Sequence, residues 1–93
     1  MQIVWTATAI RHLAAIQTYI ERDKPEAARR VASAIRQTVA YLAEHPYLGR
    51  AGRKPGTREL VIAGTRYVVP YRVKGDRLAI LAVLHGAQRR DVM

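Results

Sequence analysis

The chain has 93 residues, with 16 lysine and arginine residues against 7 aspartate and glutamate residues, and a net charge of +9. It contains no cysteine, which excludes disulfides, thiolate catalysis, iron–sulfur clusters and cysteine-based zinc sites. With 49% apolar residues and no uncharged run of about 18 residues, we expect a single globular domain over residues 1–93 and no membrane association.

The chain opens with residues 2–5, which are short and β-prone and predict a first strand. The N-terminus lacks a basic region followed by a long apolar core, which indicates a cytoplasmic protein without a signal peptide. Thr6 or Thr8 can cap a first helix directly after the strand. Its inner face is predicted by apolar residues at three- and four-residue spacing, namely Ile10, Leu13, Ile16 or Gln17, and Ile20.

A second helix begins at Pro25, because proline is favoured at the first helical position and Glu26 supplies an acid to the first turn. It ends at His45-Pro46, since the residue before a proline is pushed out of helical geometry. Its predicted inner face consists of Ala28, Val31, Ile35, Thr38 and Leu42. Only a few residues separate the two helices, so we expect an antiparallel helical hairpin.

Three further strands are predicted over residues 60–63, 66–73 and 78–85. Tight turns join them at Gly64-Thr65 and at Lys74-Gly75-Asp76. The middle strand contains Pro70, whose missing backbone donor predicts a bulge or an edge position there.

The resulting order β-α-α-β-β-β predicts a two-layer α+β domain. In this domain the helical hairpin packs on one face of a small antiparallel sheet. The two helices reverse the chain, so the first strand and the next one run antiparallel if they are neighbours in the sheet.

The positive charge is concentrated in the sheet half of the chain. Residues 1–45 hold 6 basic and 4 acidic side chains, whereas residues 46–93 hold 10 and 3, so the excess is +2 against +7. Arginine outnumbers lysine by 13 to 3, and its forked guanidinium suits phosphate and carboxylate. The charge therefore indicates an acidic partner, either nucleic acid or an acidic protein.

Residues 46–56, PYLGRAGRKPG, are a loop by composition. The loop carries Arg50, Arg53 and Lys54 and is either a solvated connection or a site that contacts anions. Its glycine spacing does not match a phosphate-binding P-loop, and no other cofactor motif is present. No two histidines have metal-ligand spacing, so neither a metal nor a cofactor is expected.

Several short motifs occur in a fixed order along the chain: Leu42 at a helix end, His45-Pro46, Gly49-Arg50, Arg58-Glu59, Tyr71-Arg72 and residues 83–85. Together with the element order, they resemble the RelE/ParE superfamily of type II toxin–antitoxin toxins over nearly the whole chain. The resemblance implies a small bacterial toxin of an addiction or plasmid-stabilisation module. It also implies a separately encoded antitoxin whose acidic segment covers the basic surface, in an assembly that can reach a heterotetramer or more.

Two activities share this fold, so the fold alone does not choose between them. The resemblance implies either a RelE-like, metal-independent endoribonuclease that cleaves messenger RNA on the ribosome, or a ParE-like, non-enzymatic inhibitor of DNA gyrase. RelE-like nucleases carry arginine after the first tyrosine of a Tyr-Arg-x-x-Tyr pattern. With the last tyrosine aligned to Tyr71 and the first to Tyr67, Val68 replaces that arginine.

The C-terminus departs from the nuclease pattern as well. Many nucleases place a tyrosine near the end, but no tyrosine follows Tyr71, and the chain ends Arg89-Arg90-Asp91-Val92-Met93. We therefore expect a gyrase poison, with the ribosome-dependent nuclease as the alternative. A non-toxic nucleic-acid-binding module that uses the same charge is a third possibility.

His85 is the candidate for acid–base catalysis, because imidazole titrates near neutral pH and this residue ends a strand. Arg58 and Glu59 on a neighbouring strand are its candidate partners, and a structural or partner-binding role is the alternative. His12 is expected on the helix surface. The residues expected to bind a target or partner are Arg50, Arg53, Lys54, Arg58, Arg66, Arg72, Arg89 and Arg90.

Overall fold

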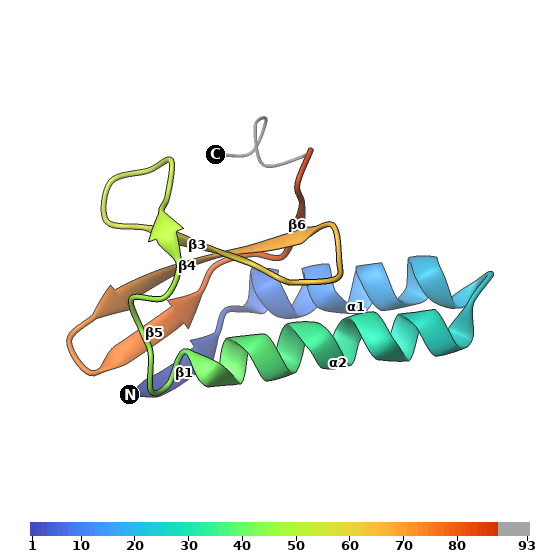
Figure 1. Cartoon of the computed structure of the whole chain (residues 1–93), viewed down its shortest axis with the longest axis horizontal. Helices are drawn as coiled ribbons and strands as arrows, with labels where there is room; N and C mark the ends of the chain where they lie inside the picture. Colours follow the sequence, from blue (N-terminus) through green and yellow to red (C-terminus); the bar gives the residue numbers. More distant parts are fainter. Residues whose placement is uncertain (88–93) are drawn as a thin grey trace.

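The computed structural model describes residues 1–87 of the chain. Two helices lie side by side on one face of a sheet of short strands (Figure 1), which confirms the predicted two-layer α+β fold. The described residues contain no helix that is long and apolar enough to cross a membrane. The elements are β1 (Gln2–Trp5), α1 (Ala7–Glu21), α2 (Pro25–Tyr41), β2 (Arg50–Ala51), β3 (Arg58–Val61), β4 (Tyr67–Lys74), β5 (Arg77–Ile80) and β6 (Leu84–His85).

The helix starts agree with the sequence. Thr6 caps α1, since its hydroxyl oxygen accepts the Ala9 N–H at 3.2 Å. The same hydroxyl donates to the Ile80 carbonyl at 2.7 Å, so the cap also ties the start of α1 to the end of β5. Pro25 occupies the first position of α2, as predicted.

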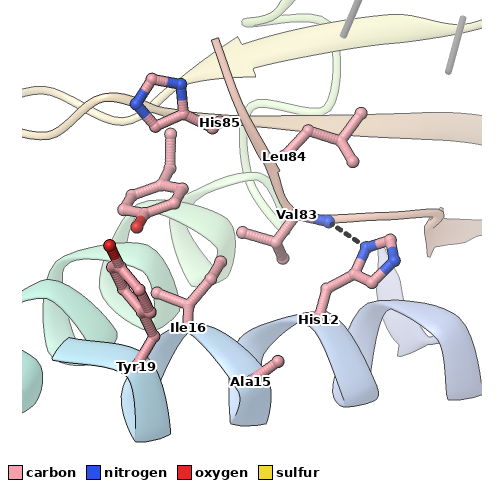
Figure 2. Close-up of a pocket in the computed structure, with 8 residues that line it drawn as sticks. His12, Ala15, Ile16, Tyr19, Val83, Leu84 and His85 are labelled. Atoms are coloured by element: carbon pink, nitrogen blue, oxygen red, sulfur yellow. Dashed lines mark hydrogen bonds between the residues drawn. The ribbon is translucent and has the colours of Figure 1, made fainter. Parts of the chain in front are cut away.

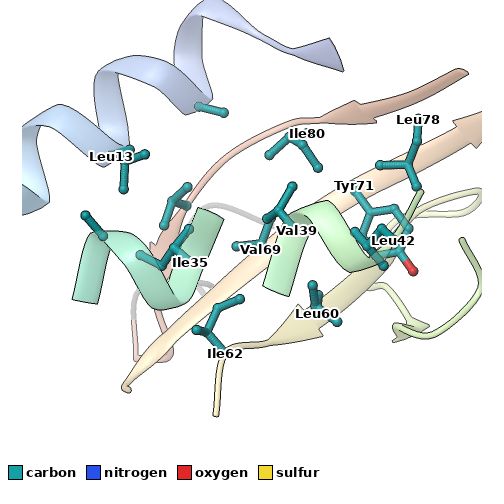
Figure 3. Packing of buried hydrophobic residues seen from close by; sticks show 13 residues of the cluster. Leu13, Ile35, Val39, Leu42, Leu60, Ile62, Val69, Tyr71, Leu78 and Ile80 are labelled. Carbon is teal, nitrogen blue, oxygen red and sulfur yellow. The ribbon is translucent and has the colours of Figure 1, made fainter. Parts of the chain in front are cut away.

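Side chains from both helices and three strands form the core between the layers (Figure 3). From α2, Ile35 and Val39 are fully buried, and Leu42 directly after the helix is buried with them. Val31 is half-buried against the core, while Arg29 and Arg36 lie on the exposed face. The sheet contributes Leu60, Val69, Tyr71, Leu78 and Ile80.

The prediction for α1 is wrong at one position, because Ile10 is 55% exposed. Capping at Thr6 sets the phase of the helix so that Ala9 and Leu13, four residues apart, face the sheet. Ile10 is turned about 100° from Ala9 around the axis and points to the side of the hairpin. The small side chain of Ala9 lets the helix approach the sheet closely.

The sheet has the strand order β1-β5-β4-β3-β2, with β6 also paired to β4. β1 is not a neighbour of the strand that follows the helices. Instead it pairs in parallel with β5, from Gln2 opposite Arg77 to Trp5 opposite Ile80. The remaining pairs are antiparallel, so the sheet is mixed. The short β2 lies within the segment that the composition predicts as loop.

The predicted strand over residues 78–85 is divided into β5 and β6, which pair with the same edge of β4. From the pair Tyr71↔Ile80 to the pair Val68↔Leu84, β4 spans three residues, whereas the segment that joins β5 to β6 spans four. This segment therefore has one residue more than the stretch of β4 opposite it. This is a β-bulge. It lies beside Pro70, whose carbonyl still accepts the Leu81 N–H at 2.9 Å. The predicted bulge is confirmed, whereas an edge position is wrong because β4 is central.

Candidate functional site at the basic end of the sheet and beside helix α1

The buried phenol of Tyr71 organises the basic end of the sheet. Its hydroxyl donates to the Pro46 carbonyl and accepts the Gly49 N–H, both at 2.8 Å. A Cβ atom added to Gly49 would lie 2.7 Å from the Tyr71 ring, so only glycine allows this close approach. Burial raises the pKa of Tyr71, although the hydrogen bond from Gly49 and the charge of Arg58 act in the opposite direction.

Arg58 is held in place by the segment that Tyr71 anchors. Its Nη1 atom donates to the Gly49 carbonyl at 2.8 Å and to the Tyr47 carbonyl at 3.3 Å. The guanidinium carbon lies 4.9 Å from the centre of the Tyr47 ring, within the range of a cation–π contact. A small hollow of about 240 Å³, called the Arg58 pocket below, is lined by Tyr47, Ala51, Gly56, Thr57, Arg58 and Val73.

The loop between β2 and β3 carries two further predicted cations, Arg53 and Lys54, and both are exposed. The loop is closed by backbone contacts, since the Gly52 N–H donates to the Thr57 carbonyl at 2.8 Å. The Thr57 hydroxyl also donates to the Lys54 carbonyl at 2.6 Å. Arg53 and Lys54 therefore stand on an ordered turn, a few residues before Gly56 and Thr57, which line the Arg58 pocket.

The face of the sheet that points away from the helices has a different character. The pair Glu59↔Pro70 lies on this face, as does the pair Val61↔Val68, because side chains alternate along a strand. Glu59 is only 2% accessible and forms an ion pair with Arg50 at 3.7 Å. This pairing partly neutralises Arg50, whose side chain is otherwise exposed.

Two of the arginines expected to bind a target, Arg66 before β4 and Arg72 within it, do not reach the position of Val68. Arg72 is exposed on the same face, four residues along β4 from Val68, which corresponds to roughly 13 Å. Arg66 is exposed in the connection before β4, and its carbonyl accepts the Gly86 N–H at 2.8 Å. Arg89 and Arg90 lie outside the described residues.

His85 lies on the opposite, helix-facing side of the sheet, in a groove between α1 and the bulge (Figure 2). The groove has a volume of about 640 Å³ and is lined by His12, Ala15, Ile16, Tyr19, Tyr67, Val83, Leu84 and His85. The His85 ring meets Tyr67 edge to face, with ring centres 5.9 Å apart. Its Nδ1 atom accepts the Ala87 N–H at 3.2 Å.

His12 is half-buried, so the expectation that it lies on the helix surface is wrong. Its Nδ1 atom accepts the Val83 N–H at 3.2 Å, as Figure 2 shows. The bulge turns this backbone donor away from β4, and the helix supplies the acceptor. The spacing of the sequence could have indicated that His12 faces the groove, because His12, Ile16 and Tyr19 follow one another at i, i+4 and i+7 on one face of α1.

The predicted partners of His85 do not converge on it. His85 pairs with Tyr67 on the helix side of the sheet, whereas Glu59 pairs with Pro70 and points to the other side. Arg58 is on the helix side but pairs with Tyr71, about 13 Å along β4 from Tyr67. Within residues 1–87, no three histidine or acidic side chains lie close enough together to hold a metal ion.

Comparison with known proteins identifies relatives along nearly the whole chain. The family model described as the ParE toxin of the type II toxin–antitoxin system parDE matches residues 3–90. The chain is 48% identical over 88 residues to the candidate toxin Y4kP of Sinorhizobium fredii, which covers 95% of this chain and 91% of that protein. It is 37% identical over 87 residues to Toxin RelE2 of Caulobacter vibrioides, covering 94% and 97% respectively.

Among solved structures, the chain matches one from the chromosomal ParDE toxin–antitoxin system of P. aeruginosa with a TM-score of 0.83. The two are 30% identical, and the match covers 91% of this chain and 95% of that one.

Proposed function

Because the chain belongs to the ParE toxin family of type II toxin–antitoxin systems, we propose that it arrests growth by poisoning DNA gyrase in the cytoplasm. We further propose that an acidic segment of its antitoxin neutralises it by covering the basic end of the sheet. The family establishes the toxin fold and an antitoxin partner, and the proposal adds the target and the mode of neutralisation.

The outer face of the sheet is the main support for a gyrase poison. In the position where the nuclease pattern requires arginine, Val68 is buried and faces Val61. Its neighbours on this face are Pro70 and the acid Glu59. Cleavage of RNA requires side chains that stabilise a developing negative charge and transfer protons. The side chains of Val68 and Pro70 do neither, and the carboxylate of Glu59, which pairs with Arg50, adds negative charge to this face.

The exposed cations support binding to acidic partners. Arg53, Lys54 and Arg72 are exposed, and Arg58 is half-exposed. Of the described arginines, Arg50 forms the ion pair with an acidic side chain reported above, which leaves a net positive surface at this end of the sheet. Such a surface attracts acidic proteins and nucleic acid–protein complexes.

One observation favours the nuclease as a second candidate. The groove beside α1 contains two imidazoles, His12 and His85, and two phenols, Tyr19 and Tyr67. These groups are of the type that transfers protons in metal-independent RNA cleavage. One relative, 37% identical, also bears the name RelE2.

Two assays run side by side test the proposal. Purified chain should inhibit the supercoiling activity of gyrase, and it should leave messenger RNA on programmed ribosomes uncut. Expression without the antitoxin should arrest growth, and co-expression of the antitoxin should restore it. Site-selective cleavage of ribosome-bound messenger RNA with unimpaired supercoiling would contradict the proposal and indicate that the protein is a nuclease.

A matched pair of variants tests the location of the interaction. Arg53→Ala with Lys54→Ala removes two charges from the basic end of the sheet, whereas Arg29→Ala with Arg30→Ala removes two from the exposed face of α2. We expect the first pair to weaken gyrase inhibition and the second to leave it nearly unchanged. Salt-dependent binding of DNA or RNA without growth arrest would instead indicate a non-toxic nucleic-acid-binding module.

A further inference from the structure

We propose that the Arg58 pocket is a preformed receptor for a single carboxylate group of the antitoxin, carried by an aspartate or glutamate side chain. The inference rests on the proposed neutralisation by an acidic antitoxin segment and names one point of that interaction. It is carried by the fixed position of Arg58, by the lack of a carboxylate partner for its charge among residues 1–87, and by the small, largely apolar walls around it.

The position of Arg58 is fixed by a series of contacts that begins in the core. The phenol of Tyr71, buried in the core, holds the Pro46 carbonyl and the Gly49 N–H. The Gly49 carbonyl in turn accepts from Nη1 of Arg58 at 2.8 Å. The Tyr47 ring covers the guanidinium at 4.9 Å. An arginine held in this way loses little conformational freedom when it binds a ligand, which favours affinity.

The charge of Arg58 has no carboxylate partner in the described part of the chain. The acid next to it in sequence, Glu59, points to the opposite face of the sheet and pairs with Arg50. Both carbonyl contacts of Arg58 use the same nitrogen, Nη1. The other side of the forked guanidinium is therefore available for a carboxylate, which binds this group in a bidentate manner.

The dimensions and walls of the pocket favour a protein side chain over a nucleic acid backbone. A volume of about 240 Å³ admits one short side chain. Besides Arg58, its walls include Ala51, Val73 and the Tyr47 ring. A phosphate backbone follows rows of cations, since each phosphate carries its own charge. The single guanidinium group of Arg58, with Ala51, Val73 and the Tyr47 ring beside it, instead suits one carboxylate group that is next to an apolar group of the partner.

The test measures dissociation of the complex between the full chain and its antitoxin. We expect Arg58→Ala to weaken binding about 10- to 100-fold, the range for a charge-assisted hydrogen bond that loses its partner. Arg58→Lys should retain the charge but lose most of this affinity, because it lacks the fork. Lys54→Ala, which removes an equal charge from the exposed turn between β2 and β3, should weaken binding less than about fivefold.

A second set of variants changes only the antitoxin and leaves the Arg58 pocket intact. Each aspartate or glutamate of the antitoxin is replaced by asparagine or glutamine and combined with Arg58→Lys in a double-mutant cycle. One acid should couple to Arg58, so that its replacement weakens the wild-type complex but has little effect in the Arg58→Lys complex. This set remains informative even if Arg58→Ala fails to fold.

The possible outcomes separate this inference from the proposed function. Equal losses for Arg58→Ala and Lys54→Ala, or no coupled acid, would indicate diffuse attraction and overturn the inference while the neutralisation stands. Loss of RNA or DNA binding in Arg58→Ala with an unchanged antitoxin complex would also overturn it. Failure of the wild-type chain to bind the antitoxin at all would refute the proposed neutralisation together with the inference.

Discussion

The hydroxyl of Tyr71 accepts the backbone N–H of Gly49 at 2.8 Å, across 22 residues of sequence. This contact joins the central strand β4 to the segment between α2 and β2. Because Gly49 also binds Arg58 through its carbonyl, the core of the protein determines where a surface cation lies.

Replacement of Tyr71 by phenylalanine should destabilise the fold at neutral pH. The phenyl ring fills the same space, but the Pro46 carbonyl and the Gly49 N–H lose their partner. An unsatisfied buried polar group costs about 1–3 kcal/mol, so we expect the free energy of unfolding in urea to fall by about that amount. Tyr19→Phe, at an exposed position of α1, is the matched control and should change stability by less than about 0.5 kcal/mol.

The same variant should alter the pH dependence of stability above pH 10. Burial raises the pKa of Tyr71 above the ordinary value of 10.0, so the unfolded chain loses this proton at a lower pH than the folded chain. The stability contributed by the neutral phenol is therefore complete below pH 10 and is lost as the pH rises through the folded pKa. The difference in unfolding free energy between wild type and Tyr71→Phe should narrow with alkaline pH, and a widening difference would contradict this assignment.

Substitution of Gly49 by alanine should also destabilise the protein. The cause is a steric clash of the added Cβ atom and not the backbone conformation of this residue. The added Cβ would lie 2.7 Å from Tyr71 and 2.8 Å from the Glu59 carbonyl, and neither the core ring nor the strand can move easily. We expect a loss of about 1–3 kcal/mol in the free energy of unfolding. Gly86→Ala is the control, since the added Cβ atom would lie 3.5 Å from the Arg66 carbonyl oxygen, an ordinary van der Waals distance. The melting temperature of this variant should be close to that of the wild type.

Replacement of His12 by alanine should loosen the bulge between β5 and β6. The Val83 N–H would lose its acceptor, which costs about 1–2 kcal/mol for a partly buried donor. Hydrogen exchange at the Val83 amide should accelerate beyond the change at amides in α2. Arg11→Ala, an exposed neighbour on the same helix, should leave the exchange rate of Val83 unchanged; similar acceleration in both variants would show that the effect is not local.

Replacement of His85 by alanine distinguishes a poison from a nuclease. A nuclease that uses His85 as acid or base should lose about 10² or more in cleavage rate. A gyrase poison should instead retain its inhibition of supercoiling. The paired variant Arg89→Ala with Arg90→Ala should weaken that inhibition by about 3- to 10-fold, since it removes two positive charges that attract an acidic partner. Loss of toxicity in His85→Ala with unaffected folding would argue for the nuclease.

The local elements could be predicted from the sequence because their signals depend on neighbouring residues. The cap at Thr6 and the start of α2 at Pro25 follow from the chemistry of those residues at helix ends. The turn between β4 and β5 follows in the same way, with Gly75 in the positive-φ conformation that the turn requires. The bulge beside Pro70 follows from a missing backbone donor.

The sequence by itself determined that this protein is a basic, cysteine-free α+β chain whose motifs resemble the RelE/ParE toxins. Only the tertiary structure decided which distant residues meet. Alternation along a strand places Glu59 and His85 on opposite faces of the sheet, and this depends on the pairing of both strands with β4. The contacts of His12 with Val83 and of Tyr71 with Gly49 likewise span 71 and 22 residues. Such contacts depend on how the helices and strands pack, which no local spacing in the sequence records.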